Sequence, residues 1–120
     1  MALKRVSLVT LPPVAIFEFG VAVEVFGMDR RDNGIEPFDF RVCAVEPGVP
    51  LPAKDVDPFT ITPQHGLDEV PDSDLVIVSA TLVREDADYP PEVLDALRAA
   101  YANGATVLSL PLPDGLRGGR

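Results

Sequence analysis

The sequence predicts an α/β domain built on an open, mostly parallel sheet with helices on both faces. Short apolar or β-branched runs occupy four places, each ended by proline, glycine or polar residues, and two longer helical patterns lie between them. The order is strand, helix, strand, strand, helix, strand. Such alternation is typical of parallel sheets covered by helices, joined by right-handed crossovers.

In the first half of the chain, residues 6–10 predict a buried strand that ends at residues 11–13, Leu-Pro-Pro. Residues 17–28 predict a helix that is apolar nearly all round, so we expect both the sheet and a further partner to cover it. Residues 38–45 predict a second strand, which stops at residues 46–48, Glu-Pro-Gly. Two parallel strands joined by one helix form a βαβ unit.

In the second half, residues 49–63 carry four prolines and predict a loop or small hairpin outside the core. Residues 74–79 contain the strongest buried-strand signal and should lie centrally in the sheet. A helix should start at Pro90-Pro91 and end at Asn103-Gly104, before a strand at residues 106–110. The apolar residues of this helix that recur at helical spacing are Val93, Leu94, Leu97 and Tyr101.

Composition limits the functions that this chain can perform. Its 120 residues, 47% of them hydrophobic, suit one domain. A net charge of -9 repels nucleic acid, so we expect no direct binding to DNA. No apolar stretch reaches the roughly 20 residues of a membrane span, and no signal segment is recognisable. Cys43 is alone, which rules out an intrachain disulfide or a cysteine metal cluster and suits the cytoplasm.

Several segments together resemble the amino-terminal domain of GlxA-like, AraC-type transcription regulators. That domain belongs to the ThiJ/PfpI superfamily, which is related to class I glutamine amidotransferases and has a flavodoxin-like sheet. The similarity covers residues 5–110 in the expected order. Its segments are residues 17–27 (FEFGVAVEVFG), 38–48 (FDFRVCAVEPG), 62–68 (TPQHGLD), 74–78 (DLVIV), 94–100 (LDALRAA) and 104–110 (GATVLSL).

The resemblance implies a sensor domain at residues 1–110 that is incomplete relative to the family. In the family, the strand that corresponds to residues 106–110 leads into a turn that carries a cysteine, then more sheet and a helix-turn-helix DNA reader. Here Pro111 stands in that place. Residues 111–120 match nothing in the family, so we expect an unstructured tail, as a frameshift would produce.

Glu18 is the one candidate ligand-binding residue. By resemblance, it occupies the place of an acidic residue that orients the superfamily's cysteine, so it would line a vestigial pocket. The alternative is that Glu18 only begins the first helix, where the helix dipole favours an anion. Glu24, six residues later, lies roughly 240° around the helix from Glu18, so the two carboxylates cannot form a paired acid/base site.

The other chemically active residue types favour structural roles. Cys43 lies between Val42 and Ala44 in a strand, where desolvation makes a thiol inert. His65 precedes a glycine in a predicted loop, with no nucleophile announced nearby. The acidic clusters are more typical of solvated loop charge than of a metal site, and no phosphate-binding glycine loop is present. We therefore predict no catalytic residues, no metal and no cofactor. The clusters are Asp68-Glu69, Asp72 with Asp74, and Glu85-Asp86 with Asp88.

These observations favour a ligand-sensing domain over two other functions. Its pocket would lie beyond the carboxyl ends of the strands and bind a small-molecule effector, and we expect the chain to form a homo-oligomer. A cysteine hydrolase or hydratase of the superfamily is disfavoured because Pro111 replaces the elbow cysteine. The third possibility is an interaction fragment whose sheet a partner completes.

Overall fold

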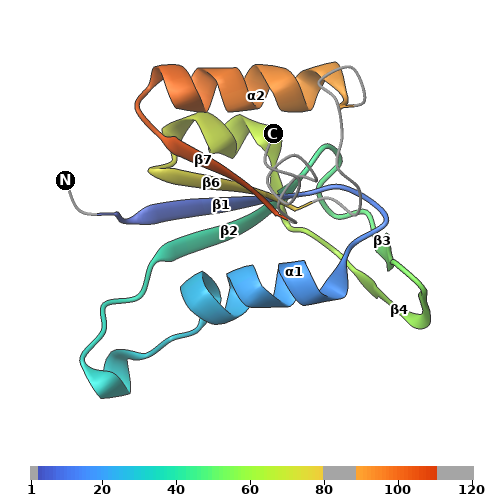
Figure 1. Ribbon diagram of the computed structural model, residues 1–120, viewed down its shortest axis with the longest axis horizontal. Helices are drawn as coiled ribbons and strands as arrows, with labels where there is room; N and C mark the ends of the chain where they lie inside the picture. The colour runs from blue at the N-terminus through green and yellow to red at the C-terminus, as the bar shows by residue number, and fades with distance from the viewer. Residues whose placement is uncertain (1–2, 80–88, 111–120) are drawn as a thin grey trace, which may run out of the picture.

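The computed structural model describes residues 3–79 and 89–110, and its centre is a five-stranded parallel sheet. The strand order is β5-β2-β1-β6-β7, so the first strand lies in the middle (Figure 1). The predicted tail at residues 111–120 lies outside the described residues. The strands are β1 Arg5–Thr10, β2 Asp39–Ala44, β5 His65–Gly66, β6 Leu75–Ser79 and β7 Thr106–Leu110.

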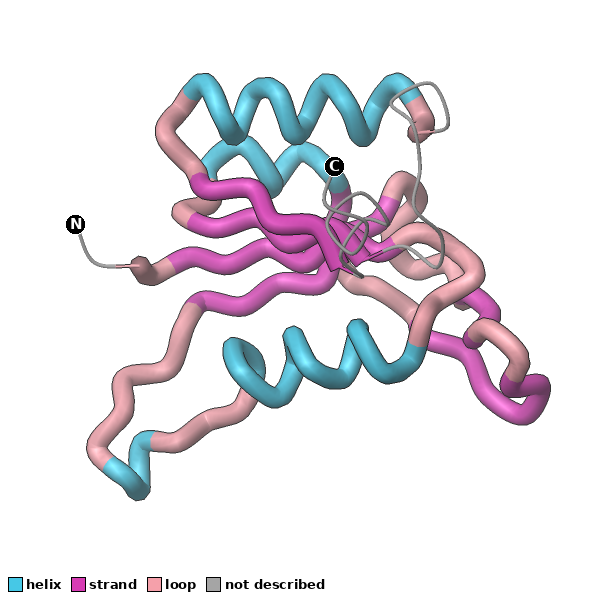
Figure 2. The backbone as a smooth tube through the Cα atoms, in the orientation of Figure 1, coloured by secondary structure: helices cyan, strands magenta, loops and turns pink. Residues whose placement is uncertain are grey.

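Helices cover both faces of the sheet, as the sequence predicts. The α1 helix (Ile16–Ala22), extended by a π-helical segment at Val23–Gly27, lies on one face. The α2 helix (Pro91–Ala102) and a 3₁₀ helix (η3, Leu67–Asp72) lie on the other face. Figure 2 shows these two helices on the side of the sheet opposite α1. The predicted α/β fold class is confirmed.

Two apolar clusters, one on each face, form the core. Strand alternation sends successive side chains to opposite faces, so Val6 and Leu8 of β1 meet α1, while Val9 faces η3 and α2. The β6 strand is buried along its whole length, which agrees with its unbroken apolar sequence. Leu8 and Ile77, both at most 1% exposed, are the largest side chains that the core fully encloses.

The segment after β2 leaves the sheet as a hairpin, as its prolines predict. Strands β3 (Leu51–Ala53) and β4 (Val56–Ile61) pair with each other in antiparallel fashion and join no other sheet. Val14, in the connection between β1 and α1, bonds to β3 through its backbone, so the hairpin is fastened beside the carboxyl end of β1. A short 3₁₀ turn (η2, Arg31–Asn33) ends at Gly34, whose φ of 79° favours glycine.

The exposed sides of the two helices are detail that the sequence pattern does not give. The sheet covers one side of α1; the outer side is uncovered within the described residues, Phe17 being 78% exposed, and the further partner expected there stays a prediction. In α2 the side that faces the sheet carries Val93, Ala96 and Ala100, while Tyr101 is 73% exposed. Small alanines let α2 approach the sheet closely, which a pattern based only on large side chains does not reveal.

Candidate functional site

The order in which strands are added to the sheet changes side at β1. The chain passes from β1 to β2 on one side and later to β6 on the other, so β1 and β6 flank a topological switch point. In open α/β sheets, ligands bind beyond the carboxyl ends of the strands at such a point. The residues that end these two strands, Thr10 and Ser79, are register partners.

The side chains of Thr10 and Ser79 are buried polar groups. Each residue is 1% exposed, and neither hydroxyl oxygen has a hydrogen-bond partner among the described parts of the chain. Buried hydroxyls are normally paired, because leaving one unpaired costs about 1–3 kcal/mol. Two such groups side by side at the switch point therefore mark the strongest candidate for a binding site.

A hollow of about 270 Å³ opens next to Thr10. Two of the residues that line it, Thr10 and Ala44, are the last residues of the neighbouring strands β1 and β2. Because Val9 pairs with Cys43, Thr10 and Ala44 lie side by side on the face of the sheet that α1 covers. The described residues that line it are Thr10, Leu11, Pro12, Ala44, Val45, Glu46, Val49, Leu51 and Pro90. The hollow therefore lies at the carboxyl ends of β1 and β2.

Thr10 and Ser79 were not singled out from the sequence. The available signal was weak: each is a hydroxyl residue that closes a buried, otherwise apolar strand. Glu18, the residue that was singled out, is half-buried in the first turn of α1 and is not among the described residues that line the hollow. A role for Glu18 in ligand binding stays a prediction.

We expect that replacing Thr10 raises the stability of the protein, which is unusual for a buried residue. Thr10→Val removes a buried hydroxyl that has no partner in the described part of the chain, so we expect the free energy of unfolding to rise by about 1 kcal/mol. Urea denaturation measures this change. Thr60→Val, at an exposed position of β4, is the control and should change stability by less than about 0.5 kcal/mol. A clear loss of stability in Thr10→Val would show that the hydroxyl is satisfied.

A chain of ion pairs lies at the amino-terminal part of the sheet, away from the hollow. Arg41 of β2 bonds to Asp39 at 3.0 Å and to Glu69 of η3, and Asp39 also contacts Arg5 at 3.3 Å. The Arg41 guanidinium lowers the pKa of Asp39. At Glu69 the pKa is lowered first by the contact with His65 and then by Arg41.

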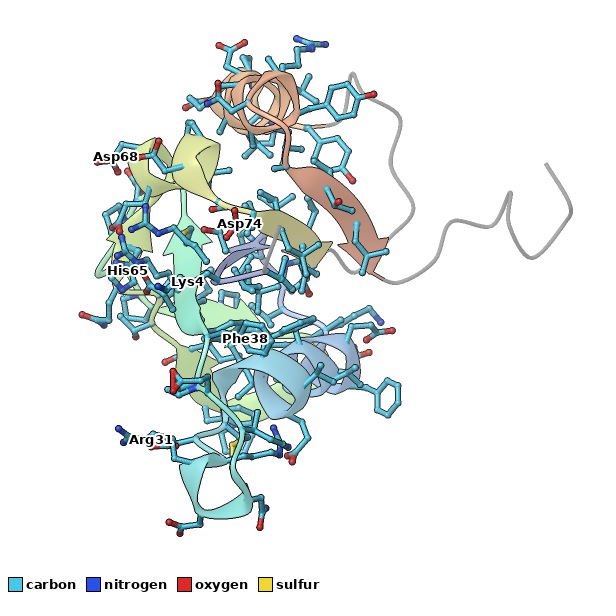
Figure 3. The ribbon with its side chains drawn as sticks, turned by 90° about the vertical axis from the view of Figure 1, so that its left-hand side faces the viewer. Lys4, Arg31, Phe38, His65, Asp68 and Asp74 are labelled. Carbon is cyan, nitrogen blue, oxygen red and sulfur yellow. The ribbon has the colours of Figure 1, made fainter. Side chains whose placement is uncertain are left out.

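His65 and the acidic residues near it differ from the sequence predictions. His65 belongs to the edge strand β5 instead of a loop, and its Nδ1 lies 2.7 Å from Glu69 Oε2. Glu69 and Asp74 are paired instead of being merely solvated. The η3 helix brings Glu69 to Arg41, and Asp74, just before β6, reaches the backbone amides at the start of β1. Figure 3 shows His65 at the sheet edge and Asp74 close to Lys4.

The Asp74 carboxylate fastens the amino-terminal end of β1. Its Oδ2 accepts hydrogen bonds from the backbone amides of Arg5 at 2.8 Å and Lys4 at 2.9 Å, and these bonds lower the pKa of Asp74. Because folding lowers the pKa of Asp74, its ionised carboxylate stabilises the fold. This stabilisation is fully present above the unfolded-state pKa of roughly 4 and is lost as the pH falls below that value.

Acid titration followed by circular dichroism should therefore be less steep for Asp74→Asn than for the parent protein. An equal slope for the two proteins would contradict this.

Cys43 is inert in this fold. It is fully buried, and burial raises the pKa of its thiol to about 11. We therefore expect iodoacetamide at pH 8 to modify Cys43 at least about 100-fold more slowly in the folded protein than in urea, since the thiolate is the reactive form and is also enclosed. Mass spectrometry of timed samples measures both rates. Equal rates would show that the strand opens readily.

Other kinds of site receive no support from the described residues. Across residues 3–79 and 89–110, no three histidine, cysteine or acidic side chains are grouped as metal ligands would be. No helix among these residues has the length and apolar character that crossing a membrane requires.

Solved structures resemble this chain over most of its length. An AraC family transcriptional regulator from Pseudomonas putida matches with a TM-score of 0.66 and 17% identity over 88% of this chain. DJ-1beta from Drosophila melanogaster matches with 0.66 and 22% over 90%. A two-domain protein with DJ-1/ThiJ/PfpI-like and ferritin-like domains from Anabaena variabilis matches with 0.64 and 14% over 88%.

This chain spans only part of those proteins: 55% of the regulator, 55% of DJ-1beta and 29% of the two-domain protein. No family profile matches the sequence, and no curated protein matches it. The likeness therefore concerns the fold. The chain has the α/β fold that the DJ-1/ThiJ/PfpI-like proteins share with an AraC family regulator, as the resemblance in its sequence implies.

Proposed function

We propose that this chain is a cytoplasmic, ligand-sensing regulatory domain of an AraC-type transcription regulator. The observation that carries the proposal is the hollow at the carboxyl ends of β1 and β2, beside the buried Thr10, whose hydroxyl has no partner among residues 3–79 and 89–110. An effector there would contact β1, β2 and the hairpin together, so its binding energy can change how these elements pack. The fold shared with an AraC family regulator supports this function.

A hydrolase or hydratase is the less favoured function. The resemblance to DJ-1beta, at 22% identity, shows a shared fold and not a shared activity. The one thiol of this chain, Cys43, is buried, and burial raises its pKa. A nucleophile must be accessible and activated, usually by a neighbouring base, and Cys43, fully buried near the carboxyl end of β2, is not accessible. We therefore assign no reaction to this domain.

A ligand screen tests the proposed function without assuming an effector. We expect at least one metabolite from an unbiased library to raise the melting temperature of the chain. Val49→Trp should abolish that rise, because the indole fills the hollow that Val49 lines. Val107→Trp, at a valine of similar exposure outside the hollow, is the matched control and should keep it. A library without hits, or hits that stabilise Val49→Trp equally, would refute the proposal.

We also propose that the outer side of α1 is the surface through which two copies associate. Phe17, Val21 and Val25 are 78%, 39% and 51% exposed, and a shallow hollow runs beside them at Gly20. Antiparallel pairing of two α1 helices about a two-fold axis near Gly20 would place each Phe17 against the valines of the other copy. The interface is therefore isologous: the same apolar surface of each copy contacts that of the other.

A further inference from the structure

We infer that Asn33 is a site of spontaneous deamidation and that the fold protects Asn103 from the same reaction. These are the two asparagines of the chain, and a glycine follows each of them. The reacting pair of residues is therefore identical at both places, and the structure around each pair sets its rate. This inference is independent of the proposed ligand-sensing function.

The reaction needs an asparagine side chain and the backbone amide of the next residue. The glycine nitrogen loses its proton and attacks the Cγ carbonyl carbon of the asparagine; a new C–N bond forms, the bond from Cγ to the side-chain nitrogen breaks, and ammonia leaves. Water then adds to one of the two carbonyl carbons of the resulting succinimide ring and breaks its bond to the glycine nitrogen. Opening at one carbon gives aspartate, and opening at the other gives isoaspartate. Glycine favours the first step because it has no Cβ to obstruct the attack.

Asn33 lies in a turn that is surrounded by solvent. The η2 turn projects away from the sheet (Figures 1 and 3), and both Asn33 and Gly34 are exposed. The Gly34 amide donates to the carbonyl of Arg31 at 2.9 Å, so the turn must open before the glycine nitrogen can react. Water replaces this exposed bond at little cost, because short surface segments open far more readily than the core. Among the described residues, no hydrogen bond holds the Asn33 side chain in place.

Asn103 is held by contacts to two helices. Its Nδ2 donates to the carbonyl of Pro71 in η3 at 3.0 Å, so the group that must rotate and leave is bonded to another element. The Gly104 amide donates to the carbonyl of Tyr101 in α2 at 3.0 Å, and the next residue, Ala105, is 6% exposed. Freeing the Gly104 nitrogen therefore disturbs the end of α2 and the start of β7 together. Such an opening approaches the cost of unfolding the core.

The modification changes the turn in two ways. Isoaspartate puts one extra methylene into the main chain, which moves the Gly34 amide out of line with the carbonyl of Arg31. Either product adds a carboxylate to a protein whose net charge is already -9. Because η2 lies outside both apolar clusters, the core does not depend on the unmodified turn. We therefore expect the product to accumulate in folded protein.

One incubation compares the two asparagines. The folded protein is kept at mildly alkaline pH for several weeks, and a second sample is kept in urea. Trypsin places the asparagines in separate peptides, residues 32–41 and 99–117, in which mass spectrometry measures conversion of amide to acid. Dividing each folded rate by the urea rate of the same asparagine removes the influence of sequence neighbours. Folding should slow Asn33 at least about tenfold less than it slows Asn103.

A variant tests whether opening of η2 controls the reaction. The Asp29 carboxylate accepts a hydrogen bond from the backbone amide of Arg31 at 3.0 Å and pairs with its guanidinium at 2.6 Å. Asp29→Ala removes both contacts, so the rate at Asn33 should rise about two- to fivefold. Glu36→Ala removes an exposed carboxylate later in the same connection and is the matched control, which should leave the rate unchanged.

Three results would overturn the inference. The first is equal protection of the two asparagines by folding, and the second is no product at Asn33 in folded protein while the urea sample reacts. The third is an Asn33 rate that Asp29→Ala and Glu36→Ala affect equally. Chromatography should also separate aspartyl from isoaspartyl forms of the Asn33 peptide. A product that is aspartyl alone would exclude the succinimide route and contradict the assigned chemistry.

Discussion

Leu8→Ala should lower the free energy of unfolding by about 2–5 kcal/mol, which is the usual cost of a leucine truncated in a close-packed core. Leu8 is fully buried in the middle of the central strand, between the side chains that face α1. Since a domain of this size has a total stability of about 5–15 kcal/mol, this one change removes a large part of it.

The matched control is Leu108→Ala, the same truncation on β7, where the leucine is 40% exposed. It should cost less than about 1.5 kcal/mol, because a leucine that already exposes 40% of its surface buries less apolar area and leaves no enclosed cavity when truncated. Chemical denaturation of both variants under identical conditions gives the comparison. Similar losses at the two positions would show that β7 is covered in solution and that its exposed side is an interface.

Phe17→Glu should abolish self-association. If two α1 helices pair as proposed, each Phe17 is a central aromatic contact, and replacing such a residue costs about 2 kcal/mol or more, a rise in the dimer Kd of at least about 30-fold. A buried carboxylate without a partner adds to this cost. Sedimentation equilibrium over a range of protein concentrations measures the change.

Tyr101→Glu is the control for this experiment. Tyr101 is an aromatic residue of nearly equal exposure, 73% against 78%, but it lies on α2, on the opposite face of the sheet. It should leave the dimer unchanged. A monomeric parent protein, or equal dissociation in both variants, would contradict the assignment of the α1 surface.

The fold was accessible to sequence reasoning because its strands are covered on both faces. Unbroken apolar runs such as residues 75–78, bounded by breakers, leave few alternatives to buried parallel strands, and four of the five strands of the sheet agree with the predictions. The two-residue β5 was missed because a strand that short has no periodicity. The position of Phe17 on the side of α1 away from the sheet could not be predicted, because composition shows that a helix is apolar without showing which side the sheet covers.

Sequence reasoning could predict the general position of the candidate site but not its residues. The rule that ligands bind beyond the carboxyl ends of parallel strands points to the same edge of the sheet as the hollow at the ends of β1 and β2. Its key residues could not be named, because the isolation of a hydroxyl depends on what packs around it in three dimensions. The pairing of Arg41 with Glu69 was hidden for the same reason, since 28 residues separate them in sequence.

The central place of β1 has a consequence for synthesis on the ribosome. This strand emerges before the other strands of its sheet, yet its contacts on one side wait for β6: the amide of Arg5 bonds to Asp74, 69 residues later. At translation rates of about 5–20 residues per second, β1 spends on the order of 3–14 seconds without that neighbour. Its apolar side chains are meanwhile available to chaperones or to other nascent chains. Codon choice or pausing within residues 11–74 should therefore affect the yield of folded protein more than the same changes placed after β6.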